Sequence, residues 1–163
     1  MRILRARDRA MGRDREPIDP DLPSAQGLAA RGPFGIVNLA FVGIGGALGT
    51  FARYCCSITW SNASGQFPTT ILVVNVTGAF LIGLVLTGLV RVGRTGGPRL
   101  FTCVGVLGGW TTMSTAAVKA DLLIAHHHAL AGIVYLLASL VGGAIATACG
   151  IAIAHRAVKV ASR

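Results

Sequence analysis

The stretch that decides the fold is GVLGGWTTMST, residues 105–115. It lies inside an uncharged apolar segment, residues 100–118, which is about as long as a helix that spans a bilayer. A membrane helix satisfies its backbone groups internally, so a pair of glycines followed closely by hydroxyl residues is unusual there. Irregular backbone at membrane depth is tolerated only where it is buried in protein or lines a water-filled path. The stretch therefore predicts a pore or a binding site rather than a simple anchor.

The composition of the whole chain supports a membrane location. Its 163 residues are 53% hydrophobic and 13% charged, and the charged share is about half that of a typical soluble protein. The long uncharged segments are apolar around most of their circumference, which excludes the amphipathic helices of a soluble bundle. They predict an all-α membrane protein with four transmembrane helices and a break in the third. We expect these helices at residues 35–57, 68–90, 99–119 and 129–154.

Positive charge is distributed on one side of this arrangement. The segment before residue 34 holds seven Arg, the connection between the second and third helices holds Arg91, Arg94 and Arg99, and further Lys and Arg follow residue 155. With four spans these regions share one side, and the other side holds only Lys119 beside Asp121. The positive-inside rule then predicts that both termini are cytoplasmic. The net charge of +9 thus reports topology in a lipid bilayer, and no nucleic-acid partner is expected because no base-reading surface is visible.

Three domains follow from these patterns. Residues 1–33 carry many charges, four prolines and no periodic apolar pattern, which is typical of a disordered tail. We expect a disordered basic cytoplasmic tail at 1–33, a four-helix transmembrane channel domain at 34–157 and a short basic C-terminal tail at 158–163. The long tail is either a solvated leader or a partner-binding segment.

Polar residues inside apolar spans are candidates for function. Arg53, near the end of the first helix, is either an anchor that reaches to water or a charge that concentrates anions in a vestibule. Asn75, near the middle of the second, either joins helices or lines an aqueous path. Tyr135 and Ser139 are four residues apart and share a face of the fourth helix.

The third helix carries the densest polar group. Gly105, Gly108 and Gly109 weaken it, and carbonyls freed at a break could coordinate a cation. The hydroxyls that follow either offer donors to a path or bond back to the preceding turn. No carboxylate lies within any predicted span, which argues against a proton-coupled exporter, and no nucleophile with a neighbouring base is present, so the sequence predicts no enzyme.

Three blocks, GGALGTFARY (45–54), VNVTGAFLIG (74–83) and GVLGGWTTMST (105–115), resemble the small fluoride channels of the Fluc or CrcB type. The resemblance implies a passive channel of two antiparallel subunits in the plasma (inner) membrane of a prokaryote, with fluoride pores and a structural Na+ at the dimer interface. Such a subunit lets cytoplasmic fluoride leave the cell and lowers its toxicity. By this resemblance the carbonyls of Gly108 and Thr111 hold Na+, while the fluoride pathway includes Asn75, Met113, Ser114, Thr115 and Arg53, with Tyr135 and Ser139 as further candidates.

The third block departs from the family. The family pattern is similar to TTFSTFS-x-E, whereas this chain reads TTMSTAAVK. Met113 and Ala116 replace the two phenylalanines, and Lys119 replaces the acidic residue. Together with the one-sided charge, these departures suggest a heterodimer with a homologous subunit in the opposite orientation, with a homodimer as the alternative. Other hypotheses are a non-conducting helper subunit and a small proton-coupled multidrug exporter.

Overall fold

Helices form where the apolar segments predict them. The computed structural model describes residues 35–63, 65–94 and 96–161, so the predicted tail at 1–33 lies outside the described residues. Within these ranges three helices, α3, α4 and α8, are long and apolar enough to cross a membrane, and the all-α prediction is confirmed for the residues described. The elements are α3 (Ile36–Thr59), α4 (Thr69–Arg91), α5 (Gly97–Arg99), the π-helix η1 (Leu100–Val106), α6 (Leu107–Trp110), α7 (Met113–Ala125) and α8 (Ala129–Ala161).

The bounds of α3 and α4 agree closely with the prediction, but the later helices extend further. The predicted end of the third helix at residue 119 rests on the charges of Lys119 and Asp121. Ala116, Ala120 and Leu123 recur at helical spacing and are buried, so the helix continues to residue 125. Residues 155–161 contain no Gly or Pro, and α8 continues through them instead of ending at 154. The whole described part of the predicted C-terminal tail, residues 158–161, is therefore helical.

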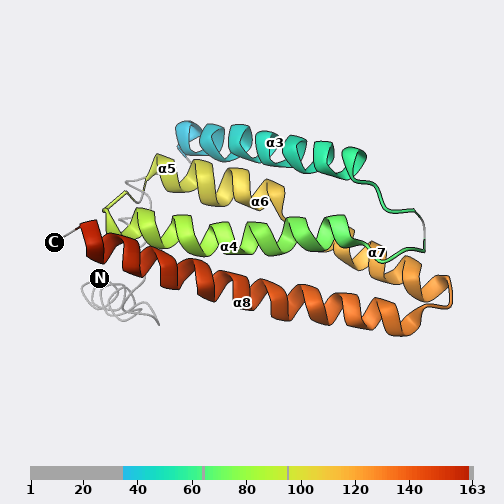
Figure 1. Ribbon diagram of the computed structural model, residues 1–163. Helices are drawn as coiled ribbons and strands as arrows, with labels where there is room; N and C mark the ends of the chain where they lie inside the picture. Colours follow the sequence, from blue (N-terminus) through green and yellow to red (C-terminus); the bar gives the residue numbers. More distant parts are fainter. Residues whose placement is uncertain (1–34, 64, 95, 162–163) are drawn as a thin grey trace, which may run out of the picture. The chain divides into compact units, whose positions relative to one another are not determined.

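The helices run back and forth along a common direction (Figure 1). α3 lies along η1 and α6, α4 lies along α8, and α7 packs on α8 beyond the interruption of the third segment. The start of α3, the connection from α4 to α5 and the end of α8 share one end of the bundle (Figure 1). The loop at 60–68 and the turn at 126–128 share the opposite end. Both ends of the helical region therefore lie together.

Glycines bring α3 against the third segment at backbone distance. A Cβ added to Gly45 would lie 2.5 Å from the Phe101 carbonyl oxygen, and one added to Gly105 would lie 2.9 Å from the Gly45 Cα. A Cβ on Gly49 would overlap the carbonyl of Val106. Lipid tails are as apolar as the side chains, so helices in a bilayer associate through this kind of close packing. Gly45 and Gly49 therefore form a close-packing face of α3.

A small core forms where α4, α7 and α8 meet. Ile71, Ala116, Leu123 and Tyr135 are buried together, and Tyr135 is fully enclosed. The ring of Phe67 meets the Tyr135 ring edge to face, with centroids 5.6 Å apart. Ala116 is fully buried in this cluster and also borders the cavity described below.

Candidate functional site

The third segment is interrupted at Thr111 and Thr112, which are extended between α6 and α7. The Thr111 N–H still closes the last turn of α6 on the Leu107 carbonyl, at 3.0 Å. The Thr112 hydroxyl begins α7 by accepting the Thr115 N–H at 3.2 Å, as a helix N-cap does. The break predicted in this stretch is thus present, and threonine rather than glycine occupies it. Gly109 packs instead against α3, where a Cβ would overlap the Gly46 carbonyl.

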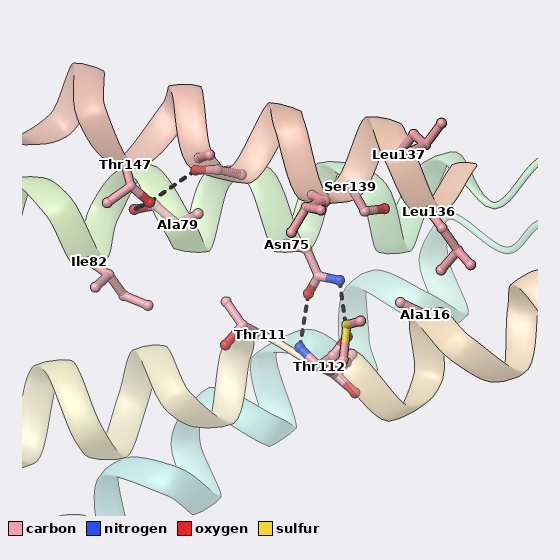
Figure 2. Close-up of a pocket in the computed structure, with 14 residues that line it drawn as sticks. Asn75, Ala79, Ile82, Thr111, Thr112, Ala116, Leu136, Leu137, Ser139 and Thr147 are labelled. Atoms are coloured by element: carbon pink, nitrogen blue, oxygen red, sulfur yellow. Dashed lines mark hydrogen bonds between the residues drawn. The ribbon is translucent and has the colours of Figure 1, made fainter. Parts of the chain in front are cut away.

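Asn75 of α4 holds the break through both of its amide atoms (Figure 2). Its Nδ2 donates to the Thr112 carbonyl at 3.0 Å, and its Oδ1 accepts the Thr112 N–H at 2.8 Å. Extended backbone inside an apolar bundle would otherwise leave these two groups unsatisfied, at a cost of about 1–3 kcal/mol each. Asn75 therefore joins two helical segments, and it also lines the cavity described below.

Arg53 reaches the same break from α3. Its Nε donates to the Gly109 carbonyl at 3.1 Å, and the side chain is partly buried. The Thr50 hydroxyl approaches the same carbonyl at 3.4 Å. In a continuous helix that carbonyl would accept the N–H of residue 113, so Arg53 replaces a donor that the break removes. The guanidinium is accordingly tied to the backbone at this end of α6.

Two further carbonyls lose their helical donors at the break. Thr112 N–H, the usual partner of the Gly108 carbonyl, bonds to Asn75 instead. Thr115 N–H, the usual partner of the Thr111 carbonyl, bonds to the Thr112 hydroxyl. Gly108 is exposed and carries no side chain. The two carbonyls predicted as cation ligands are thus those whose regular partners are taken elsewhere.

The hydroxyls after the break form a local chain. Thr112 Oγ1 lies 3.2 Å from Ser114 Oγ and donates to Thr115 Oγ1 at 3.1 Å. Thr111 Oγ1 instead bonds back to the Leu107 carbonyl at 3.0 Å, as a hydroxyl in a helix often does. Ser114 is exposed, and Met113 is 73% exposed. These two side chains lie on the open face of α7.

A cavity of about 650 Å³ lies between α4, the break and α8 (Figure 2). Of the predicted site residues, the structure brings Asn75, Thr111, Met113 and Ser139 to its wall. The predicted residues that do not line it are Arg53, Gly108, Ser114, Thr115 and Tyr135. The rest of the wall is mainly apolar and includes leucines of α8. The cavity is therefore an apolar space with polar groups concentrated near the break.

Thr147 is a lining residue that the sequence analysis missed. Its hydroxyl donates to the carbonyls of Ala79 on α4, at 3.1 Å, and Gly143, at 2.9 Å. It lies two helical turns beyond Ser139, so the four-residue spacing that joins Tyr135 to Ser139 could have found it. Ser139 donates to the Tyr135 carbonyl at 2.8 Å. Within the described residues, the buried Tyr135 hydroxyl has no hydrogen-bond partner.

The chain is similar to one family of known proteins over most of its length. Residues 40–151 match the family model described as CrcB-like protein, Camphor Resistance (CrcB). The chain belongs to the CrcB family. The match runs from the first turns of α3 to the second half of α8. It therefore includes the break, together with α3 and α4, whose side chains bond to it. This CrcB family member is a multi-pass membrane protein.

Curated relatives carry a common name. The chain is 40% identical over 121 residues to "Fluoride-specific ion channel FluC 3" of Streptomyces avermitilis, a match that covers 74% of this chain and 59% of that protein. It is 36% identical over 118 residues to "Fluoride-specific ion channel FluC" of Rhizobium meliloti, covering 71% and 94%. "Fluoride-specific ion channel FluC 2" of Streptomyces avermitilis is 40% identical over 105 residues, covering 63% and 65%. Two numbered relatives thus come from one organism.

Proposed function

We propose that the chain is a subunit of a fluoride-selective ion channel, through which cytoplasmic fluoride leaves the cell passively and fluoride toxicity falls. The observation that carries the proposal is the extended break at Thr111 and Thr112, held by Asn75 beside a cavity in an apolar bundle. A pore for a small, strongly hydrated anion must replace its water with donors, and must do so weakly enough to release it. Amides and hydroxyls near the break suit that task. The function is transport, and the names of the relatives support fluoride as the ion.

The proposed topology has four spans, α3, α4, the broken segment α5–α7, and α8, in the plasma (inner) membrane. Arg91 ends α4, Arg94 follows it and Arg99 ends α5, while Arg156 and Lys159 belong to the last turns of α8. These segments share one end of the bundle (Figure 1). In the described part of the chain the only carboxylate is that of Asp121, toward the other end. Basic residues gather on the cytoplasmic side of membrane proteins. Both termini are therefore cytoplasmic.

The proposed assembly is an antiparallel dimer with a homologous subunit. The strong Lys and Arg bias favours one orientation for this chain, so a homologue of opposite bias fits the inverted position better than a second copy does. Met113 lies 73% exposed at the break, where the resemblance implies an aromatic ring facing fluoride. The two numbered relatives of Streptomyces avermitilis are consistent with more than one family member per organism. A homodimer is the alternative assembly.

A structural Na+ at the dimer interface belongs to this proposal. The carbonyls of Gly108 and Thr111 suit a hard cation because their usual helical donors are bonded elsewhere. The Gly109 carbonyl is already occupied by the Arg53 guanidinium. Bound Na+ would supply the positive charge that fixes these two carbonyls in place.

Fluoride efflux from liposomes tests the proposal. Three preparations are compared: this chain alone, a homologous partner alone, and both together. We expect fluoride-dependent, chloride-insensitive efflux from the mixed preparation. Absence of fluoride efflux from all three would refute the channel function, and robust efflux from this chain alone would refute the need for a partner.

A second candidate function is a non-conducting helper subunit. Ala116 is fully buried and Met113 carries no ring, so this chain offers neither aromatic edge next to the break. A helper would support a path formed by its partner. Substituting Asn75 in the mixed complex discriminates, because unchanged flux would favour the helper. A proton-coupled multidrug exporter is less consistent with the structure, since the carboxylate of Asp121 is exposed near the end of α7 rather than buried in a span.

A further inference from the structure

Trp110 directly precedes the break, and the proposed conduction path does not include it. It is the final residue of α6, and its ring is partly buried. The indole Nε1 donates to the Val74 carbonyl of α4 at 2.9 Å, and the Thr77 hydroxyl lies 3.4 Å from the same nitrogen. An indole N–H in an apolar environment needs such a partner, because an unpaired donor there costs free energy.

The contact is one half of a two-point attachment. Val74, which receives the indole, is the neighbour of Asn75, which bonds the backbone of Thr112 on both sides. Consecutive residues of α4 therefore bond to Trp110 and Thr112, the residues on each side of Thr111. The Thr111 carbonyl, one of the two that the family resemblance implies as cation ligands, lies between these two attachment points.

A glycine one turn further along α4 makes room for this attachment. A Cβ added to Gly78 would overlap the Thr111 methyl group and would lie 2.8 Å from Trp110 Cδ1. The turn from Val74 to Gly78 thus presents a carbonyl, an amide side chain and a bare backbone to the end of α6. Its shape fits an indole at residue 110 and an extended residue at 111.

The last turn before the break is the weak end of a longer helix. α6 continues the helical backbone of α5 and η1, but its four residues include Gly108 and Gly109, which are poor helix formers, and the helix stops after Trp110. Packing against α3 restrains the helix, but a rotation of its last turn would still move the Thr111 carbonyl. A hydrogen bond from the ring of the last residue opposes that rotation.

We propose that Trp110 is a positioning residue whose indole N–H, together with Asn75, fixes the orientation of the helix break. Its effect on ion conduction rests on the proposed function, whereas the hydrogen bond itself does not. The aromatic ring fills space, and the N–H supplies the orientation. Removing only the N–H therefore separates the two contributions.

The test compares Trp110→Phe, which keeps an aromatic ring, with Trp110→His, which keeps a ring N–H. Trp60→Phe is the matched control, because Trp60 is 53% exposed and lies in the loop that follows α3. We expect Trp110→Phe to lower fluoride efflux about tenfold, as the loss of one orienting hydrogen bond predicts. Its thermal midpoint should fall by no more than about 4 °C. Trp110→His should recover at least part of the loss, and Trp60→Phe should match the unsubstituted protein.

The outcomes separate the two proposals. Efflux from Trp110→Phe within twofold of the unsubstituted protein would overturn the positioning role, as would a His variant no better than the Phe variant. If the unsubstituted preparations conduct no fluoride, the channel function fails, and the Trp110 bond is then judged by NMR. In the Trp60→Phe background the single labelled indole N–H should be protected from exchange with water. Exchange at the rate of a free indole would overturn the inference.

Discussion

Substitution of Asn75 by Leu should abolish most of the proposed conduction without unfolding the protein. Leu has nearly the same size and belongs in an apolar helix, so the cavity wall is preserved while both amide bonds are lost. The Thr112 N–H and carbonyl, now bonded at 2.8 and 3.0 Å, would both be left unsatisfied. At about 1.5 kcal/mol for each group the extended break is destabilised by about 3 kcal/mol. That free energy corresponds to a loss of about a hundredfold in the population of the present geometry.

The assay is fluoride efflux from liposomes at matched protein density, with the preparation that conducts. Ser57→Ala is the control, because its hydroxyl bonds only to the Arg53 carbonyl of its own helix at 2.9 Å. We expect about a hundredfold slower efflux from Asn75→Leu and unchanged efflux from Ser57→Ala. A loss smaller than about threefold, with the protein correctly inserted, would show that Asn75 does not hold a conducting geometry. That result would also favour the helper function.

Three other substitutions test the packing and the electrostatics around the break. Gly49→Ala should lower the thermal midpoint sharply, because its Cβ would overlap the Val106 carbonyl, whereas Gly43→Ala has nothing within 4 Å and should be neutral; equal midpoints would contradict the close contact of α3. Arg53→Gln should weaken the hydrogen bond to the Gly109 carbonyl and slow efflux about tenfold, because a charge-assisted bond is lost. Arg53→Lys should restore efflux in part. Full restoration by Lys would show that the charge serves only to attract anions. Ala116→Phe should destabilise the fold by about 1–3 kcal/mol because Ala116 is fully buried in the cluster with Ile71 and Tyr135, while Met113→Phe on the open face should be tolerated. Thermal unfolding in detergent measures both variants, and an equally stable Ala116→Phe would show that the ring enters the neighbouring cavity without disturbing the cluster.

The sequence predicts the fold at the level of helices and the location of the break, because both depend on local composition. The apolar lengths give α3 and α4 almost to the residue. The end of α7 is less predictable, since it depends on which face of the helix meets a neighbour. Lys119 and Asp121 suggest an end only until the burial of Ala120 and Leu123 is known.

The site is predicted less completely because its decisive bonds join residues far apart in sequence. The sequence pattern leaves two roles open for Asn75, joining helices or lining a path. In the structure Asn75 bonds to the break and also lines the cavity. Arg53 is left between an anchor and an anion-attracting charge, and its bond to a carbonyl at the break is a third arrangement that spacing alone does not indicate. The acceptor that the Trp110 indole N–H finds, the Val74 carbonyl, likewise depends on the rotation of α6. Whether these residues conduct fluoride stays a prediction.

The contact of Gly45 with Gly105 has a consequence for how the protein is made. α3 emerges from the ribosome before its partner segment, which follows about 60 residues later, and at typical synthesis speeds the delay lasts roughly 3–12 s. During that interval the bare glycine face of α3 meets lipid or the insertion machinery, and only α4 is available as a neighbour. The α3 contact therefore closes late in biogenesis, after the membrane insertion of a helix that makes few contacts with it. Slowing translation between α4 and η1 should lengthen the time for which the nascent chain is accessible to membrane proteases.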